Sequence, residues 1–252
     1  MTVTHKKIRR ATDSDRPPRL MIYARHKKGK SKLCSTANLL GKGLFLDPEH
    51  GTDWMTKLDP DVWDIEKWED LDEAYRFLKG SNHDYDWVYV DGLTRINTMS
   101  IRYVLRQSME KDLKARPRLV IKKTYYQSGE QMKSLIHNFH SLDMGVIFTA
   151  QERVITVDDD DESDDESDVE VIPQKVADLP AGVRSAVNSL ADVIGRLYIT
   201  VNDEGDTERR LWVAPDIRFD TGYRSSFVLP EYLSNPTIPK LIRAVEEGKV
   251  SR

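Results

Sequence analysis

The chain has little cysteine and no long apolar run, and both absences narrow the classes of protein to which it can belong. Its 252 residues include a single cysteine, Cys34, which excludes an internal disulfide and a cysteine-rich zinc site and favours a reducing compartment. No run of about 18 apolar residues occurs, and no apolar segment follows a basic start. The sequence therefore predicts a cytoplasmic protein without a membrane span, a secretory signal or a membrane partner.

Charge is distributed unevenly along the chain. Ten of the thirteen residues from Asp158 to Glu170 are acidic, and removing them from the net charge of −4 leaves a remainder of +6. Such a block repels itself, so we expect residues 157–175 to form a disordered acidic loop. The mildly basic remainder allows a polyanionic partner such as nucleic acid.

Short apolar runs alternate with helical patterns, which predicts βαβ units. This order favours an α/β fold in which a mostly parallel, twisted sheet carries helices on both faces. The turn at 202–206 predicts an antiparallel C-terminal edge. We expect a basic arm over 1–19, a core over 20–230 and a C-terminal helical tail over 231–252. The expected strands are 20–23, 43–46, 87–90, 145–149, 196–201 and 211–214, and the expected helices are 31–40, 68–79, 96–113, 128–142, 184–194 and 236–247.

The first apolar run leads into a loop that ends in Gly-Lys-Ser, which is typical of a phosphate-binding loop. Backbone N–H groups of such a loop hold phosphate oxygens, Lys30 would lie at the β- and γ-phosphates, and the Ser31 hydroxyl would hold Mg²⁺. Ala24 stands where the first glycine is usual. A solvated Lys-rich turn is the alternative. The expected nucleotide-binding residues are Ala24, Arg25, His26, Lys27, Lys28, Gly29, Lys30, Ser31 and Lys32.

Two acidic residues follow later strands and complete the expected site. Asp91 directly follows the run 87–90 and is placed to hold Mg²⁺ with Ser31. It could instead cap the next helix. Glu49 follows the run 43–46, and a carboxylate at this edge can orient and deprotonate the attacking water. A solvent-exposed turn acid is the alternative for Glu49.

The segment 44–53, Leu-Phe-Leu-Asp-Pro-Glu-His-Gly-Thr-Asp, resembles the part of bacterial RecA that carries its catalytic glutamate. The first strand, Asp91 and the segment 145–151 are also similar in order and spacing to the RecA-like ATPase core. Over about residues 20–230, the chain most resembles the short RecA-like recombinases and strand-annealing ATPases of bacteriophages, for which the cytoplasm would be that of the host cell.

The resemblance implies ATP and Mg²⁺ as cofactors and ring or filament assembly of the chain with itself. It implies that Lys30 and Glu49 are catalytic and that Gln151 senses the γ-phosphate. It also implies that Arg224 reaches ATP across a subunit boundary, with Arg218 as a spare, although a surface ion pair is the alternative for Arg224.

The resemblance further implies contact with single-stranded DNA, yet the acidic run stands where the family's DNA loop should follow Gln151. We therefore expect DNA to bind elsewhere, where cations adjoin aromatic rings that can stack on bases. A solvated basic face with a tyrosine in the core is the alternative. The acidic run could gate this contact, and the N-terminal arm could add to it. The expected DNA-binding residues are Arg116, Arg118, Lys122, Lys123, Tyr125 and Tyr126.

The leading hypothesis is an ATP-dependent RecA-like recombinase that anneals or pairs single strands in phage recombination and repair. A single-strand-binding protein or an exonuclease is an expected further partner. One alternative is a binding protein that anneals DNA without hydrolysing ATP. Another is a metal-dependent nuclease that uses Asp47, Glu49 and Asp91.

Overall fold

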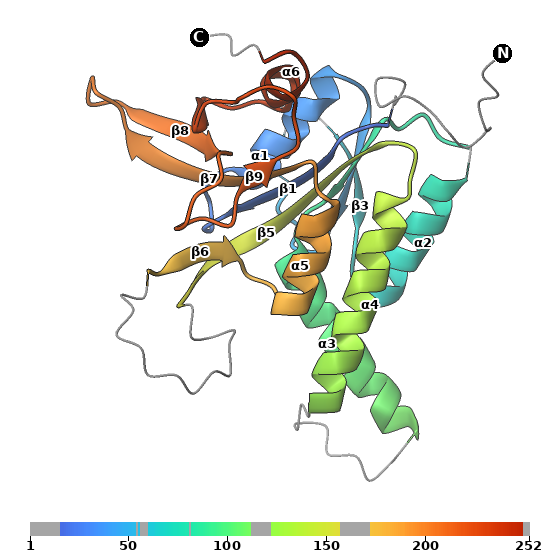
Figure 1. Cartoon of the computed structure of the whole chain (residues 1–252). Helices are drawn as coiled ribbons and strands as arrows, with labels where there is room; N and C mark the ends of the chain where they lie inside the picture. Colours follow the sequence, from blue (N-terminus) through green and yellow to red (C-terminus); the bar gives the residue numbers. More distant parts are fainter. Residues whose placement is uncertain are drawn as a thin grey trace, which may run out of the picture.

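The computed structural model describes residues 16–53, 55, 60–80, 82–111, 122–156 and 172–248 (Figure 1). Several expectations concern residues outside these ranges. They are the basic arm up to residue 15, the helical pattern at 112 and 113, Arg116 and Arg118, and the acidic run. These predictions remain predictions.

Within the described ranges, the strands belong to one ten-stranded sheet. They are β1 (Arg19–Ala24), β2 (Gly43–Asp47), β3 (Asp61–Asp64), β4 (Trp87–Val90), β5 (Gly145–Ile155), β6 (Gln174–Ala177), β7 (Val193–Val201), β8 (Thr207–Trp212), β9 (Gly222–Tyr223) and β10 (Tyr232–Ser234). The order is β10-β8-β7-β1-β5-β4-β2-β3, with β6 paired to β5 and β9 to β7. Pairing is parallel from β7 to β3 and antiparallel for β8, β10, β6 and β9. This arrangement confirms the expected fold class.

Helices cover both faces of the sheet, and buried apolar side chains form one cluster on each face. The helices are α1 (Lys30–Ser35), the 3-10 helix η2 (Thr36–Leu39), α2 (Trp68–Lys79), α3 (Leu93–Lys111), α4 (Lys122–His140), α5 (Ala181–Leu190) and α6 (Ile238–Glu247). One cluster joins α2, α3, α4 and α5 to the sheet, and the other joins α1, η2 and α6 to it. Among the described residues, no helix has the length and apolar character needed to cross a membrane.

Some expected boundaries differ from the structure. The helix expected over 184–194 ends at Leu190, and its last two positions, Val193 and Ile194, begin β7. Two β-branched residues in succession suit a buried strand next to β1 better than a helix end. The acidic loop was expected to extend to residue 175, but β6 begins at Gln174 and pairs with the extended end of β5. The strand β3 was not expected, because Asp61–Asp64 has no apolar run.

The described part of the segment expected as a helical tail, residues 231–248, contributes a strand to the sheet and a helix to its core. Strand β10 pairs with β8, so the boundary expected at residue 230 falls within this packed region. Thr237 caps α6 by accepting a hydrogen bond from the Lys240 backbone N–H at 3.2 Å. The next backbone N–H, of Ile238, donates to Thr36 Oγ1 at 2.8 Å and ties α6 to η2.

Parallel pairing places the functional segments at one edge of the sheet. Strand β5, which carries Gln151, lies between β1, which leads into the Gly-Lys-Ser loop, and β4, which leads to Asp91. Strand β2, which leads to Glu49, pairs with the other side of β4. The carboxyl ends of parallel strands share an edge, where ligands bind in open α/β sheets.

Close packing of the sheet makes one glycine a sensitive position. A Cβ at Gly145 would lie 2.3 Å from the Trp87 ring, which is paired with it on β4. We expect Gly145→Ala to lower the free energy of unfolding by about 3 kcal/mol, because this overpacking forces the ring or the strand to shift. Gly129→Ala on α4, where a Cβ meets nothing within 4 Å, should instead raise it by about 0.5–1 kcal/mol. Urea unfolding measures both, and equal effects would contradict the packing argument.

Candidate functional site

A cavity of about 540 Å³ opens at the carboxyl edge of the parallel strands. Segments far apart in the sequence line it: the Gly-Lys-Ser loop, the loop after β2, the end of β4, the start of α3 and Gln151 on β5. The structure therefore brings together the loop, Glu49, Asp91 and Gln151, as the sequence predicted.

The loop between β1 and α1 is held in a tight conformation. Lys27 has φ of 58° and Gly29 has φ of 93°, so the chain enters the left-handed region twice within three residues. Glycine tolerates that region without strain. The turn brings Lys30 and Ser31, the first residues of α1, to the wall of the cavity.

Lys30 is a buried cation at the centre of the site. Only 9% of the residue is exposed, and its Nζ donates to Gln151 Oε1 at 3.1 Å and to the Ala24 carbonyl at 3.4 Å. Burial lowers the pKa of Lys30, and the nearby carboxylates of Asp91 and Glu49 partly oppose that change. A buried ammonium with neutral hydrogen-bond partners favours an anion such as a phosphate.

Asp91 accepts hydrogen bonds from two hydroxyl groups, one on each oxygen. Ser31 Oγ donates to Oδ2, and Thr149 Oγ1 donates to Oδ1. Thr149 on β5 was not predicted, because nothing in the strand pattern sets it apart from other buried polar residues. A carboxylate and a hydroxyl in contact fit Mg²⁺, which prefers oxygen ligands and usually keeps several waters or phosphate oxygens. Ser31 and Asp91 are therefore the residues that would hold the ion.

The loop after β2 is fixed by Asp47, so that Glu49 has a defined position. Asp47 is 2% exposed and accepts hydrogen bonds from the Glu49 N–H at 2.9 Å and from both the N–H and the Oγ1 of Thr52. Glu49 itself is exposed and lines the cavity. Asp47 thus positions the loop, and Glu49 is the acid of this loop whose exposed side chain could contact a water in the cavity.

Gln151 is connected to the start of α3 by Thr94, the second residue of that helix. Thr94 Oγ1 accepts a hydrogen bond from the Gln151 backbone N–H at 3.0 Å and donates one to the Asp178 carbonyl at 3.0 Å. The side chain of Gln151 meets Lys30, and its backbone meets α3. A substitution of Gln151 would therefore disturb contacts with both the loop, through Lys30, and α3, through Thr94.

The predicted site residues do not all reach the cavity. Ala24 is buried below the loop, Arg25 is exposed away from the lining, and Lys28 contributes its carbonyl to another contact. The loop residues that line the cavity are His26, Lys27, Gly29, Lys30, Ser31 and Lys32.

Arg224 lies at the opposite edge of the sheet from the loop of its own chain. It follows β9, which pairs with the first residues of β7, and these lie beside the first residues of β1. Its Nη2 donates to the Ser189 carbonyl at 2.5 Å and its Nη1 lies 3.8 Å from Asp192 Oδ1. Arg218 pairs with Asp216. Neither arginine is therefore part of the cavity within one chain.

The described part of the expected DNA-binding segment forms the first turns of α4. Lys122 and Lys123 are exposed, as are Tyr125 at 56% and Tyr126 at 70%, so neither tyrosine lies in the core. This end of α4 points away from the sheet (Figure 1). The alternative that places a tyrosine in the core is wrong.

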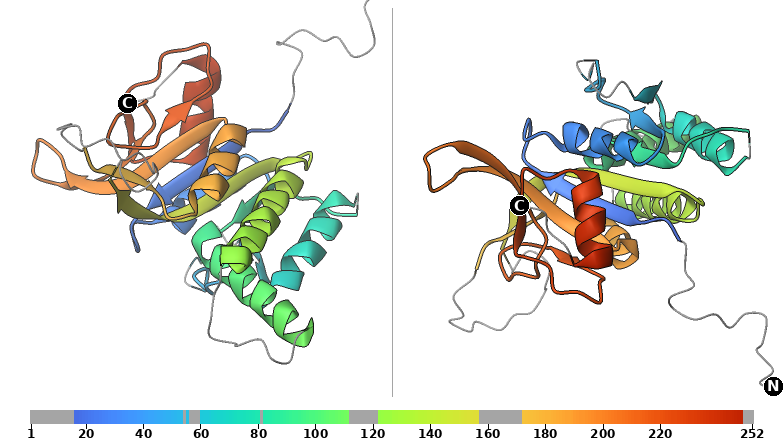
Figure 2. Two further views of the ribbon diagram at one scale, coloured as in Figure 1. Left: turned by 60° about the horizontal axis from the view of Figure 1, so that its bottom comes forward. Right: turned by 90° about the horizontal axis from the view of Figure 1, so that it is seen from above.

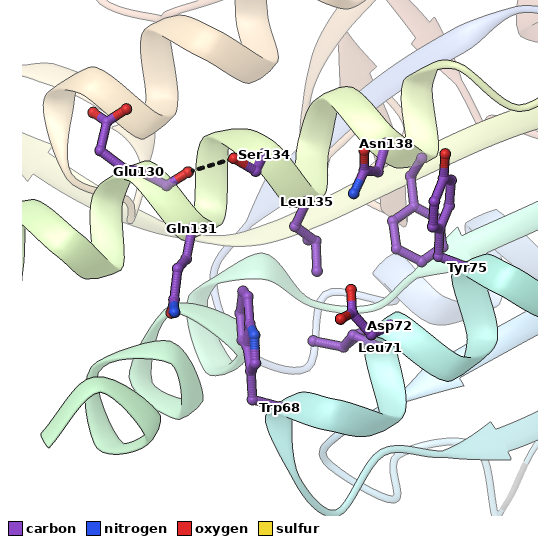
Figure 3. A pocket seen from close by; sticks show the side chains of 10 residues that line it. Trp68, Leu71, Asp72, Tyr75, Glu130, Gln131, Ser134, Leu135 and Asn138 are labelled. Carbon is purple, nitrogen blue, oxygen red and sulfur yellow. Dashed lines mark hydrogen bonds between the residues drawn. The ribbon is translucent and has the colours of Figure 1, made fainter. Parts of the chain in front are cut away.

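A second cavity, of about 290 Å³, lies between α2 and α4 (Figure 3). Trp68 and Leu71 from α2 and Leu135 from α4 line it, and none of the predicted site residues does. The first cavity, which is lined by the predicted site residues, is therefore the candidate functional site.

Comparison with known proteins supports this assignment. The model of a protein family described as "AAA domain" matches residues 16–225. The chain belongs to this family. The AAA domain is a P-loop ATPase domain, and membership supports nucleotide binding and ATPase activity in general, in agreement with the loop, Lys30 and Asp91 described above.

The fold of this AAA domain also has a similar solved structure. The crystal structure of the flagellar accessory protein FlaH from Methanocaldococcus jannaschii aligns over 88% of each chain, with a TM-score of 0.42 and 10% sequence identity. No curated protein matches the sequence.

Proposed function

We propose that this AAA domain hydrolyses ATP with Mg²⁺ and couples hydrolysis to the annealing or pairing of single-stranded DNA, as a RecA-like recombinase of the phage kind. One observation carries the ATPase part of the proposal: Lys30, Ser31, Asp91 and Gln151 meet in one cavity through direct hydrogen bonds. The loop and Lys30 would bind the phosphates, and Gln151 would read the γ-phosphate. Glu49 would take the proton of the attacking water. Bound Mg²⁺ would supply positive charge to the phosphates.

The DNA part of the proposal is supported by the exposed end of α4 and by α3. Lysines supply salt-dependent attraction to phosphates, and exposed aromatic rings supply stacking platforms for bases. Helix α3 packs against α4 and begins near Thr94, which binds Gln151. A helix of 19 residues spans about 28 Å, so α3 offers a rigid connection between DNA on α4 and the γ-phosphate.

We further propose that the chain assembles with itself as a ring or filament. The support is the position of Arg224, which lies at the far edge of the sheet and so would meet ATP only in a neighbouring subunit. A single-strand-binding protein or an exonuclease remains a proposed partner. Within the described ranges, no three His, Cys, Asp or Glu side chains gather where they could hold a metal ion, so the geometry does not favour the nuclease alternative.

The test is phosphate release measured with Mg²⁺ and ATP, titrated with single-stranded and double-stranded DNA, beside light scattering to size the assembly. Turnover that single strands increase supports the proposal. ATP binding and strand annealing without turnover would favour the non-hydrolysing alternative. Labelled DNA cut in the presence of metal and the absence of ATP would favour the nuclease.

Removing the aromatic rings of α4 should weaken DNA binding without changing the ATP site. We expect the double variant Tyr125→Ala/Tyr126→Ala to bind single-stranded DNA at least about tenfold more weakly, because each stacked base contributes roughly 1–3 kcal/mol. Its ATPase rate without DNA should stay as in the parent. Lys133→Ala, which removes an ion-paired lysine further along α4, is the matched control, and fluorescence anisotropy is the measurement. Unchanged DNA affinity in the double variant would exclude this end of α4 as the binding surface.

A further inference from the structure

An arginine from a distant strand contacts the backbone of the Gly-Lys-Ser loop. Arg209 lies on β8, in the β7–β8 hairpin that projects beyond the rest of the sheet (Figures 1 and 2). Its Nε donates a hydrogen bond to the Lys28 carbonyl at 2.9 Å. That carbonyl lies between the two left-handed residues of the loop, Lys27 and Gly29. The hydrogen bond is therefore made at the part of the loop where the backbone enters the left-handed region.

The same guanidinium also packs against the next residue of the loop. A Cβ at Gly29 would lie 3.1 Å from the Cζ, Nε and Nη2 atoms of Arg209. Glycine at this position therefore serves two needs, because it permits φ of 93° and leaves room for the arginine. The hydrogen bond and the close packing are separate observations, and both place Arg209 against the loop.

Arg209 differs in its partners from the arginine beside it. The Nε of Arg210 pairs with Glu208 at 2.6 Å, and its guanidinium lies 4.2 Å from the centre of the Tyr232 ring, on the opposite face of the strand. A guanidinium has five N–H donors, and among the described residues only the Nε donor of Arg209 has an acceptor. Within the described part of the chain, Arg209 thus has no acidic partner and places a positive charge beside the loop.

This charge has a cost in the free protein. Lys27, Lys28 and Lys30 already crowd the loop with positive charge, and a further cation raises their mutual repulsion. A bound polyphosphate would remove that repulsion and give the unused donors an acceptor nearby. The arrangement is therefore more favourable with an anion in the loop than without one.

We propose that Arg209 is a positioning residue of the nucleotide site, which holds the Lys28 carbonyl and so keeps the loop in its phosphate-accepting conformation. Its effect on ATP rests on the proposed function, whereas its effect on the loop does not. The β7–β8 hairpin thereby becomes part of the ATP site.

Hydrogen exchange of the nucleotide-free protein tests the positioning role. Peptides that cover residues 24–34 should exchange faster in Arg209→Ala than in the parent, whereas Arg210→Ala, the neighbouring position on the same strand, should leave them unchanged. A wild-type exchange rate in Arg209→Ala overturns the proposal. This measurement remains decisive even if the parent protein does not bind ATP, a result that would contradict the proposed function instead.

Nucleotide affinity tests the consequence for ATP. The Kd of a fluorescent ATP analogue and the KM for ATP should rise about tenfold in Arg209→Ala, as expected for loss of one charged hydrogen bond, with kcat little changed because ground state and transition state use the loop alike. Arg209→Lys, which keeps the charge and one donor, should recover part of the loss. Faster exchange together with parental ATP affinity would mean that Arg209 stabilises the loop without affecting nucleotide binding. That result would overturn the proposal.

Discussion

Lys30→Ala should abolish ATP hydrolysis, with a fall in kcat/KM of about 10³-fold or more. The buried ammonium is held between Gln151 and the Ala24 carbonyl, so its charge is screened little by water and acts strongly on a developing phosphate charge. Phosphate release and the binding of a fluorescent ATP analogue measure the loss.

The control for Lys30→Ala is Lys32→Ala, because Lys32 lines the same cavity but is exposed. We expect it to change the rate only a few-fold, since an exposed charge interacts weakly. Burial lowers the pKa of Lys30, which means that its charged form is disfavoured by the fold. Loss of Lys30 should therefore leave the melting temperature unchanged or raised. Full activity in Lys30→Ala would contradict the assignment of the loop.

Glu49→Gln should leave ATP bound but lower kcat by about 10²–10⁴-fold, which is the usual contribution of a positioned general base. The amide keeps the shape of the side chain and cannot accept the proton of the attacking water. The Kd for ATP should stay within twofold of the parent value, so the substitution would change the rate and leave the affinity unchanged. Single-turnover hydrolysis measures the chemical step directly.

Asp53→Asn is the matched control for Glu49, because Asp53 is an exposed acid on the same loop. We expect parental rates from it. Parental hydrolysis by Glu49→Gln would mean that Glu49 is only a solvent-exposed turn acid, the alternative that the sequence also allowed.

Much of the site could be predicted from the sequence because it follows strand ends. Each of Lys30, Glu49, Asp91 and Gln151 comes shortly after or at the end of an apolar run, and parallel strands bring such positions to one edge. The positions of apolar runs in the sequence are enough for this inference, because it does not require the order of the strands in the sheet. The position of Glu49 in the cavity agrees with that expectation.

The sequence could not indicate the residues that act through long-range pairing. Thr149, Thr94 and Arg209 lie within ordinary strand or helix patterns, and their partners are more than 50 residues away. They become part of the site through the pairing of β5 with β4 and through the contact of the β7–β8 hairpin with the loop. The same reason explains β3, whose four residues Asp-Val-Trp-Asp are too few to carry a strand pattern and which pairs with β2 at the edge of the described sheet.

The order of strands has a consequence for folding. The loop and Gln151 sit on adjacent strands although 121 residues separate Lys30 from Gln151, so their contact closes a very long stretch of chain. Non-local pairing of this kind forms late and slowly. A partly folded chain would then lack the nucleotide site altogether, and ATP would bind the native state alone. The ligand would thus stabilise the whole domain by an amount that grows with the logarithm of its concentration above Kd, and the fraction of chains that bind ATP would report the fraction that has finished folding.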